Sequence, residues 1–239
     1  MSRPVKAVRR TRNMRVVEEV FEPLAGKRIL DVGCGRGPLC RALIKRGAVP
    51  TGIDVSGEAL AHARALCPEV KFLECSASAM PFADGGFDGA VFLNSLHHVP
   101  HVEMKQALRE ALRCVGRGDR ALILEPVAEG AYFEVMRPFH DETVIRAQAL
   151  EAIDDLCREQ GAVLRERLTF EVNHPVDSAE EVMRHAVEVD PRRLAKIRRN
   201  ELQIKESFKR FALPAGDGYV LGQPMIAVTL SQRRDSQGA

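Results

Sequence analysis

The sequence predicts an α/β fold built on an open, mostly parallel sheet with helices on both faces. Three observations predict this fold. Apolar stretches of strand length alternate with stretches of helical periodicity through the first 126 residues. Glycine, proline and cap-forming residues stand at the boundaries between these stretches. The expected strand at 88–94 is apolar on both faces, which is typical of a parallel strand covered by helices.

The first expected strand, residues 28–32, runs into a glycine-rich turn at 33–37 and then into a helix. Three glycines at alternate positions leave backbone N–H groups uncovered and permit φ values that other residues resist. A ligand can therefore approach the main chain at the positive end of the following helix. The second expected strand, 49–55, delivers Asp54, a carboxylate placed where it can accept hydrogen bonds from two hydroxyls of a ribose.

The alternation continues along the chain. After Ser56, a plausible N-cap, we expect a helix that ends before Pro68. Further strands are expected at 70–75, 88–94 and 120–126, with a helix between the last two. Ligands of such sheets lie beyond the carboxyl ends of the strands, so the strand tips are where we expect the functional residues.

The second half of the chain is less regular. Residues 127–141 are expected to form a long connection, followed by a helix that closes at Gly161 and by a sixth strand at 164–172. An apparent insertion follows. It contains a capping box at Ser178, a cap at Asp190 and a long helix over 191–210. A loop at 213–218 leads to a last strand at 219–230.

Composition limits the classes of protein that this chain can represent. The 239 residues are 45% hydrophobic and 28% charged, which suits a globular domain with a full core. With no signal-type segment and no apolar run of membrane-spanning length, we expect a cytoplasmic protein without a membrane partner. The six cysteines show no metal or disulfide spacing and are expected to be reduced. A net charge of +2 is too small to indicate a polyanion partner by itself.

The spacing of the glycines narrows the function. A dinucleotide fingerprint would need its third glycine where Pro38 stands, which disfavours a nicotinamide enzyme. Instead the pattern Asp-x-Gly-x-Gly-x-Gly at 31–37, followed by Gly-Ile-Asp at 52–54, resembles the class I S-adenosylmethionine-dependent methyltransferases. The stretches Ala-Met-Pro-Phe-Ala-Asp-Gly-Gly-Phe-Asp at 79–88 and Leu-His-His-Val at 96–99 are similar to the subgroup that includes the ubiquinone and menaquinone biosynthesis C-methyltransferases.

This resemblance implies a Rossmann-like, doubly wound sheet of seven strands with the last strand antiparallel. It also implies a division of the chain. We expect a basic N-terminal arm and helix at 1–25, a methyltransferase core at 26–176 and 214–230, a helical lid insertion over the acceptor pocket at 177–213, and a disordered tail at 231–239.

The resemblance also implies which residues hold S-adenosyl-L-methionine. The wall around the methionine part of the cofactor would be formed by Asp31, Gly33, Cys34 and Gly35. The ribose hydroxyls would be held by Asp54, and Val55 would pack on the adenine. The remaining expected contacts are Ser76 and Ala77 near the adenine and the backbone carbonyl of Asn94 near the cofactor's amino group.

One position departs from the family's pattern. The third strand tip commonly reads Gly-Asp-Ala, whose acid accepts a hydrogen bond from the adenine amino group, whereas this chain has Cys-Ser-Ala at 75–77. Ser76 still offers an acceptor, but without a charge. The adenine contact is thus expected to be weaker or to rest on the backbone of Ala77.

Histidines are the candidates for the chemistry itself. Transfer of a methyl group from a sulfonium needs alignment and exclusion of water, and a base only if the acceptor must lose a proton. We expect His98 and, less directly, His140 to orient the acceptor or act as a base. The cluster of His97, His98 and His101 lacks a carboxylate or cysteine at ligand spacing, so no metal site is expected.

The acceptor itself stays open. The leading interpretation is a small molecule methylated at oxygen, carbon or nitrogen. Asn-Ser-Leu-His at 94–97 lacks the proline-rich motif of enzymes that methylate bases of nucleic acids, so a nucleic-acid acceptor is disfavoured. Two basic segments, at 1–15 and 191–210, keep an RNA or carrier-protein acceptor as an alternative, although a solvated terminus and a solvated helix face are the favoured interpretations of these segments. A non-catalytic family member that binds cofactor and a protein partner is the third interpretation.

Overall fold

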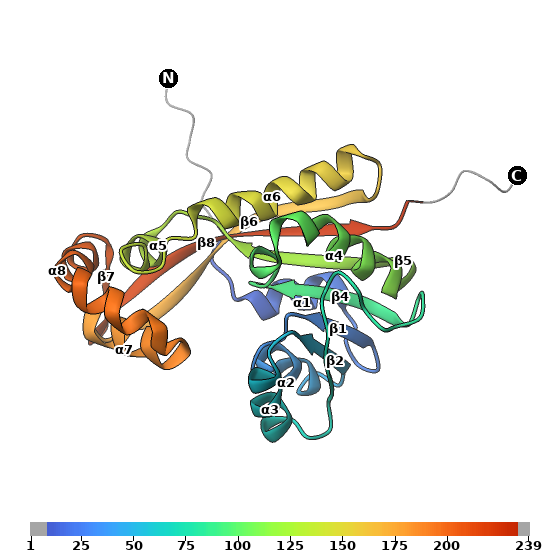
Figure 1. Ribbon diagram of the computed structural model, residues 1–239, viewed down its shortest axis with the longest axis horizontal. Helices are drawn as coiled ribbons and strands as arrows, with labels where there is room; N and C mark the ends of the chain where they lie inside the picture. Colours follow the sequence, from blue (N-terminus) through green and yellow to red (C-terminus); the bar gives the residue numbers. More distant parts are fainter. Residues whose placement is uncertain (1–8, 234–239) are drawn as a thin grey trace, which may run out of the picture. The chain divides into compact units, whose positions relative to one another are not determined.

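The structure is a computed structural model that describes residues 9–233 (Figure 1). Its eight strands form one sheet in the order β3-β2-β1-β4-β5-β8-β6, with β7 paired to β8 beside this path. The strands are β1 (Arg28–Val32), β2 (Val49–Asp54), β3 (Lys71–Glu74), β4 (Phe87–Leu93), β5 (Val115–Pro126), β6 (Val163–Val176), β7 (Leu213–Ala215) and β8 (Gly218–Ser231). The sheet is mostly parallel, and its last strand is antiparallel, as the sequence predicts.

The helices alternate with the strands through the first half of the chain and cluster in the second half. They are α1 (Asn13–Phe21), α2 (Pro38–Ile44), α3 (Gly57–Leu66), α4 (His101–Cys114), α5 (Ala131–Met136), α6 (Thr143–Arg158), α7 (Ala179–Val189) and α8 (Leu194–Phe211). Two short 3₁₀ turns, η1 (Leu96–His98) and η2 (Pro191–Arg193), complete the set in the described part of the chain. None of these helices is both long and apolar enough to cross a lipid bilayer.

Parallel pairing brings the functional loops to one edge of the sheet. Val32 at the end of β1 stands opposite Ile53 on β2 and Phe92 on β4. The pairing of β4 with β5 and of β2 with β3 is also parallel. The connections that leave β1, β2, β3 and β4 therefore start from the same edge, where the sequence places most of the candidate residues.

The chain divides into two compact units. Within the described residues, the core unit comprises residues 13–125, 147–168 and 226–233, and the helical unit comprises residues 9–12, 126–146 and 169–225. The strands β6 and β8 each contribute residues to both units.

The core unit is built by helices that cover the parallel strands. A Cβ added at Gly89 on β4 would lie 2.4 Å from the ring of Phe21, so glycine allows α1 to pack directly on this strand. On the side of β2 and β3, Leu60 and Ala63 of α3 pack with Phe72 in one apolar cluster. Ser56 caps α3, because its hydroxyl accepts a hydrogen bond of 3.2 Å from the Ala59 N–H.

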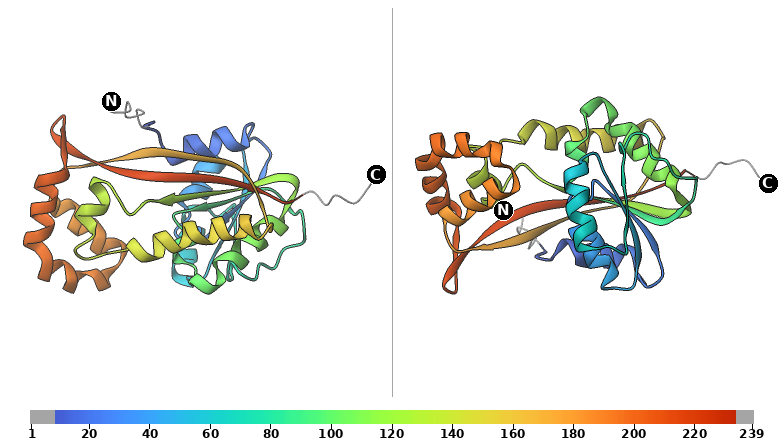
Figure 2. Two further views of the ribbon diagram at one scale, coloured as in Figure 1. Left: turned by 90° about the horizontal axis from the view of Figure 1, so that it is seen from above. Right: turned by 60° about the horizontal axis from the view of Figure 1, so that its bottom comes forward.

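The helical unit has an apolar core of its own. In Figure 2, α5, α7 and α8 gather beside β7. Their buried faces share one cluster that includes Met183 of α7, Ile204 and Phe208 of α8, and Phe139 after α5. As predicted, Ser178 caps α7 by accepting from the Glu181 N–H at 3.2 Å.

Five details differ from the sequence-based expectations, and the first is that the sixth strand extends to Val176 rather than ending at residue 172. The connection at 127–141 contains the short helix α5, and the loop at 213–218 contains β7. The fifth strand starts at Val115 rather than at residue 120, because Val115 pairs with Phe87 before a register shift. The long helix over 191–210 opens with the turn η2, since Asp190 caps Pro191–Arg193 before α8 begins. The expected arm and tail lie mostly at residues 1–8 and 234–239, outside the described residues.

Candidate functional site

The loop between β1 and α2 is fixed by backbone hydrogen bonds and by positive φ at glycine. The N–H groups of Gly33 and Cys34 donate to the Ile53 carbonyl at 2.8 and 2.9 Å. Gly33 has φ 73°, and a Cβ there would lie 2.5 Å from the Cβ of Ser95. Gly35 has φ 52°, but nothing lies within 4 Å of where its Cβ would be. A ligand therefore finds open space beside the main chain at Gly35.

Asp54, at the end of β2, is joined to this loop. Its Oδ2 accepts a hydrogen bond of 2.8 Å from the Gly35 N–H, and its Oδ1 accepts one of 2.9 Å from the Ser56 N–H. A carboxylate offers about four lone-pair positions, so two remain for hydroxyl donors of a ligand. The next residue, Val55, is 71% exposed and presents an apolar surface beside that carboxylate.

Asp31 lies beneath the loop and is 1% exposed. The Cys40 thiol donates to its Oδ2 at 3.2 Å. Burial raises the pKa of Asp31 to about 7, against the smaller opposing effect of this hydrogen bond, so the carboxyl group is poised to change charge near neutral pH. Burial also raises the pKa of the Cys34 and Cys40 thiols, which keeps both thiols protonated.

The tip of β3 carries a small hydroxyl network. The Ser78 hydroxyl donates to Glu103 Oε2 at 2.6 Å, and the Ser76 and Ser78 hydroxyl oxygens lie 2.8 Å apart. Because the Ser78 proton is used on the carboxylate, the Ser76 hydroxyl must donate to Ser78. Ser76 Oγ accepts from the Ser78 N–H at 3.1 Å, which leaves it one lone pair for a further donor. Ala77 is half-buried between these two serines.

Sequence reasoning missed a buried polar network behind the tip of β4. Asn94 has φ 53° and is exposed, whereas the side chains of Ser95, His97 and Glu125 that follow or face it are buried. Glu125 Oε1 accepts from the N–H groups of Ser95 and Leu96 at 3.2 and 2.9 Å, and Oε2 contacts His97 Nδ1. The only signal for it in the sequence is an acid at the end of the apolar fifth strand.

This network holds the loop after β4 against the glycine loop. The Ser95 hydroxyl donates to the Val32 carbonyl at 2.6 Å, and Ser95 is the residue that a side chain at position 33 would strike. The backbone around Asn94 is thus fixed from two sides, by Glu125 and by the end of β1.

Residues 29–118 match the family model described as "Methyltransferase domain". This segment contains the glycine loop, Asp54, the β3 tip and Asn94, all in the order that the sequence motifs predict. Residues 29–118 form a class I S-adenosylmethionine-dependent methyltransferase domain.

Curated proteins that are similar to this methyltransferase domain are themselves named as methyltransferases. The chain is 33% identical over 153 residues to "Methyltransferase GfsG" of Streptomyces halstedii, which covers 59% of this chain and 54% of that protein. It is 37% identical over 133 residues to "Demethylmenaquinone methyltransferase" of Thermus thermophilus, covering 52% of this chain and 59% of that protein. The chain therefore matches little more than half the length of these relatives.

Solved structures match the chain beyond the methyltransferase domain. A Bacillus halodurans protein described as a "putative methyltransferase" is 18% identical and matches 91% of this chain and 97% of that chain with a TM-score of 0.62, which shows the fold. The [4+2]-cyclase SpnF, 25% identical, covers 91% of this chain and 79% of that chain with a TM-score of 0.61. Proteins of this fold thus include one whose name states a different reaction.

The residues present fit the cofactor of this family. The open space at Gly35 provides a backbone surface, and the two unused acceptor positions on Asp54 provide a site for two hydroxyls. The exposed Val55 provides an apolar face, and the free lone pair on Ser76 provides an acceptor for an amino group. The backbone surface suits the methionine part of S-adenosylmethionine, the hydroxyl site suits the ribose, and the apolar face and the amino-group acceptor suit the adenine.

The two candidate histidines lie in different units. His98 ends η1 in the core unit, is exposed, and its ring centroid is 4.1 Å from that of His97. His140 belongs to the helical unit, where its Nε2 lies 3.0 Å from Arg193 Nη2 and 2.8 Å from Glu142 Oε1. Whether either histidine meets an acceptor stays a prediction.

Proposed function

We propose that the chain transfers a methyl group from S-adenosyl-L-methionine to a small-molecule acceptor at oxygen, carbon or nitrogen. The observation that carries the proposal is the pairing of the open backbone at Gly35 with the partly satisfied carboxylate of Asp54. A relative whose name states that it acts on demethylmenaquinone supports a small-molecule acceptor.

The family resemblance implies the cofactor contacts, and the local chemistry supports them. We assign the wall around the methionine part to Asp31, Gly33, Cys34 and Gly35, with ionised Asp31 countering a cationic group. Asp54 accepts from the ribose hydroxyls, and Val55 packs on the adenine. Ser76 accepts from the adenine amino group next to the Ala77 backbone, and the Asn94 carbonyl accepts from the amino group of the methionine part.

The bound cofactor supplies an electrophilic methyl group, and the chain's residues align an acceptor and exclude water. A base is needed only where the acceptor must lose a proton. We assign acceptor orientation or proton removal to His98 and His140, because neutral imidazole accepts protons near neutral pH. His98 is the stronger candidate, since it follows the fixed loop that holds Asn94.

Ligand-dependent stability tests the proposal. S-adenosylhomocysteine at about 100 times its dissociation constant should stabilise the fold by roughly 2.7 kcal/mol, whereas NAD at the same concentration should not. Differential scanning fluorimetry of the full chain measures both. Stabilisation by NAD alone would contradict the assignment, because Pro38 breaks the glycine spacing of a dinucleotide site.

The second candidate function is that of a methyltransferase-family protein that binds S-adenosylmethionine but catalyses a different reaction or no reaction. The likeness to the [4+2]-cyclase SpnF favours keeping it. Release of S-adenosylhomocysteine with a panel of phenol, enolate and amine acceptors separates the two functions. Binding of S-adenosylhomocysteine without turnover on any acceptor would favour this second candidate.

A further inference from the structure

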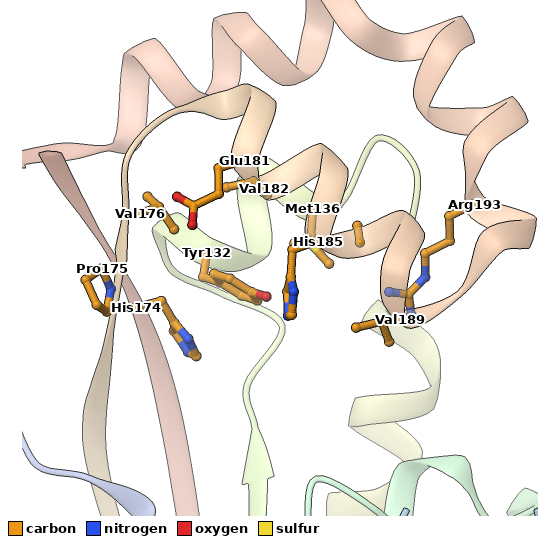
Figure 3. Close-up of a pocket in the computed structure, with 11 residues that line it drawn as sticks. Tyr132, Met136, His174, Pro175, Val176, Glu181, Val182, His185, Val189 and Arg193 are labelled. Carbon is orange, nitrogen blue, oxygen red and sulfur yellow. The ribbon is translucent and has the colours of Figure 1, made fainter. Parts of the chain in front are cut away.

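The helical unit contains a cavity of about 350 Å³ that the cofactor assignment does not use (Figure 3). This volume is within the range of sites for small organic ligands. Its walls come from α5, the end of β6, α7 and η2. The lining residues that carry the argument are Tyr132, Met136, His174, Glu181, Val182 and Arg193.

One wall of the cavity is a flat aromatic surface. Tyr132 and His174 stack with their ring centroids 4.3 Å apart and an interplanar angle of 25°. Burial raises the pKa of the Tyr132 hydroxyl and lowers the pKa of His174, so both rings are neutral near pH 7. Met136 and Val182 add apolar, adaptable surface. These neutral rings and aliphatic groups favour a planar, largely apolar ligand body.

The opposite end of the cavity carries a guanidinium group. Arg193 lines the cavity, and its side chain is only 16% exposed. Its Nη2 contacts His140 Nε2 at 3.0 Å, whereas its buried Nε has no hydrogen-bond acceptor in the part of the chain that the structure describes. A buried N–H without an acceptor costs free energy that a ligand oxygen would recover.

The nearby acids do not supply that acceptor. Asp190 Oδ2 lies 3.9 Å from Arg193 Nε, too far for a hydrogen bond. Asp190 is instead held by Arg192, through its Nε at 2.8 Å and its Nη2 at 3.1 Å. Glu181, on the cavity wall, accepts from the Asp177 N–H at 2.5 Å and so belongs to the cap of α7. Arg193 therefore keeps donor capacity toward the cavity.

We propose that this cavity binds a planar ring that bears a carboxylate, with the carboxylate on Arg193 and the ring beside Tyr132. Only the assignment of this ligand as the methyl acceptor rests on the proposed function. A guanidinium matches a carboxylate with two parallel N–H donors. A phosphate is less suited, because Arg193 is the sole arginine or lysine among the residues that line the cavity.

His140 has a place in this arrangement as a positioning residue. Its Nε2 cannot accept from Arg193 and donate to Glu142 Oε1 at once, because one ring nitrogen either carries a proton or offers a lone pair. When a ligand carboxylate takes Nη2 of Arg193, the His140 Nε2–H can turn to Glu142. Nε2 of His140 therefore keeps a hydrogen-bond partner when the ligand binds.

A matched pair of probes tests the carboxylate. We expect 6-hydroxy-2-naphthoate to bind the full chain about tenfold more tightly than 6-hydroxy-2-naphthamide, as one charge-assisted hydrogen bond implies. In Arg193→Gln the preference should fall below about twofold, while S-adenosylhomocysteine affinity is unchanged. Arg198→Gln is the control, because Arg198 is exposed on α8 and does not line the cavity.

NMR spectra of the wild-type chain show whether the acid binds in this cavity. The Met136 methyl resonance, assigned by its loss in Met136→Leu, should shift when the acid is added. Equal affinity for acid and amide would overturn the proposal, and so would tight acid binding that leaves Met136 unmoved. These two readings need no Arg193 variant to fold. Failure of the proposed function is separate, since it would appear with acid binding intact, either as no binding of S-adenosylhomocysteine or as binding without methyl transfer to any acceptor.

Discussion

The carboxyl group of Asp31 is buried under the glycine loop, and its charge therefore depends on the groups around it. Asp31 is 1% exposed, and its nearest polar partner is the Cys40 thiol. A thiol is a weak donor that stabilises the carboxylate little against desolvation. Without ligand, the carboxyl group is therefore held close to the point at which it gains and loses its proton. A cationic ligand group beside it would favour ionisation.

This environment predicts that stability depends on pH. The pKa of Asp31 is raised from 3.8 to about 7, so the folded state binds more protons than the unfolded state between these values. Stability should then fall as pH rises through that window, by about 2 kcal/mol between pH 5 and 7. Urea denaturation of the wild type and of Asp31→Asn, which keeps an oxygen for Cys40, isolates this contribution. A constant difference between the two proteins would contradict the raised pKa.

Removal of the Asp54 carboxylate should weaken ligand binding much more than it lowers the stability of the fold. Asp54→Ala removes acceptors for two ribose hydroxyls, and charged hydrogen bonds contribute on the order of 1.5–3 kcal/mol each. We expect affinity for S-adenosylhomocysteine to fall at least about 100-fold by calorimetry. The variant also loses the bonds from Gly35 and Ser56, so a modest loss of stability is expected. Glu58→Ala, an exposed acid four residues on, is the control, and unchanged affinity in folded Asp54→Ala would refute the assignment.

Residues of the candidate site differ in how far the sequence could reveal them. Asp54 stands at a strand end behind a recognisable glycine pattern, so its place follows from local signals. Glu125 and His97 are 28 positions apart and meet only because β4 and β5 pair in parallel. No local pattern reports such a contact. Likewise the role of Gly33 depends on Ser95, which is distant in sequence and close in space.

At the scale of elements, length and periodicity decided what could be predicted. The strands β1, β2 and β4 are buried, bounded by turn signals, and were expected within a residue or two. β7 has three residues, all exposed and one of them Pro214, so it has neither alternation nor apolar content to predict it. α5 has six residues and begins after Gly130, whose φ is 91°. A helix so short gives too few turns for a period to appear.

Loss of the N-terminal cap of α7 should lower the stability of the protein. Ser178 accepts from the Glu181 N–H, and its loss should cost about 1 kcal/mol of unfolding free energy in Ser178→Ala. Ser178→Asp keeps an acceptor at this position and places a negative charge at the helix N-terminus, so it should retain most of the stability. Chemical denaturation of both variants gives the comparison. An equal loss in both would show that the hydroxyl does more than cap the helix.

At the scale of the molecule, the two compact units carry different parts of the proposed chemistry. The nine proposed cofactor residues all belong to the core unit, which contains the whole matched methyltransferase domain. The cavity with Tyr132 and Arg193 belongs to the helical unit. The lid proposed at 177–213 is part of that unit, together with residues 126–146. Its closure over an acceptor stays a proposal.

This division predicts a separation between turnover and cofactor affinity. His98→Ala and His140→Ala should each lower turnover while leaving S-adenosylhomocysteine affinity within about threefold, because a group that touches only acceptor or transition state changes the rate and not cofactor binding. The stronger effect is expected for His98, which lies on the loop fixed by Ser95 and Glu125. His62→Ala, an exposed histidine on α3, is the matched control.

The two histidines can be distinguished further, because His140 contacts Arg193. His140→Gln keeps a side-chain oxygen that can accept from Arg193 in the ligand-free protein, so it should preserve acid binding but lower turnover if His140 also moves a proton. Normal turnover in both alanine variants would mean that acceptor activation lies elsewhere or is unnecessary, as for an amine that is already unprotonated. A loss of cofactor affinity as severe as that of Asp54→Ala would instead show that cofactor and acceptor functions do not divide between these residues.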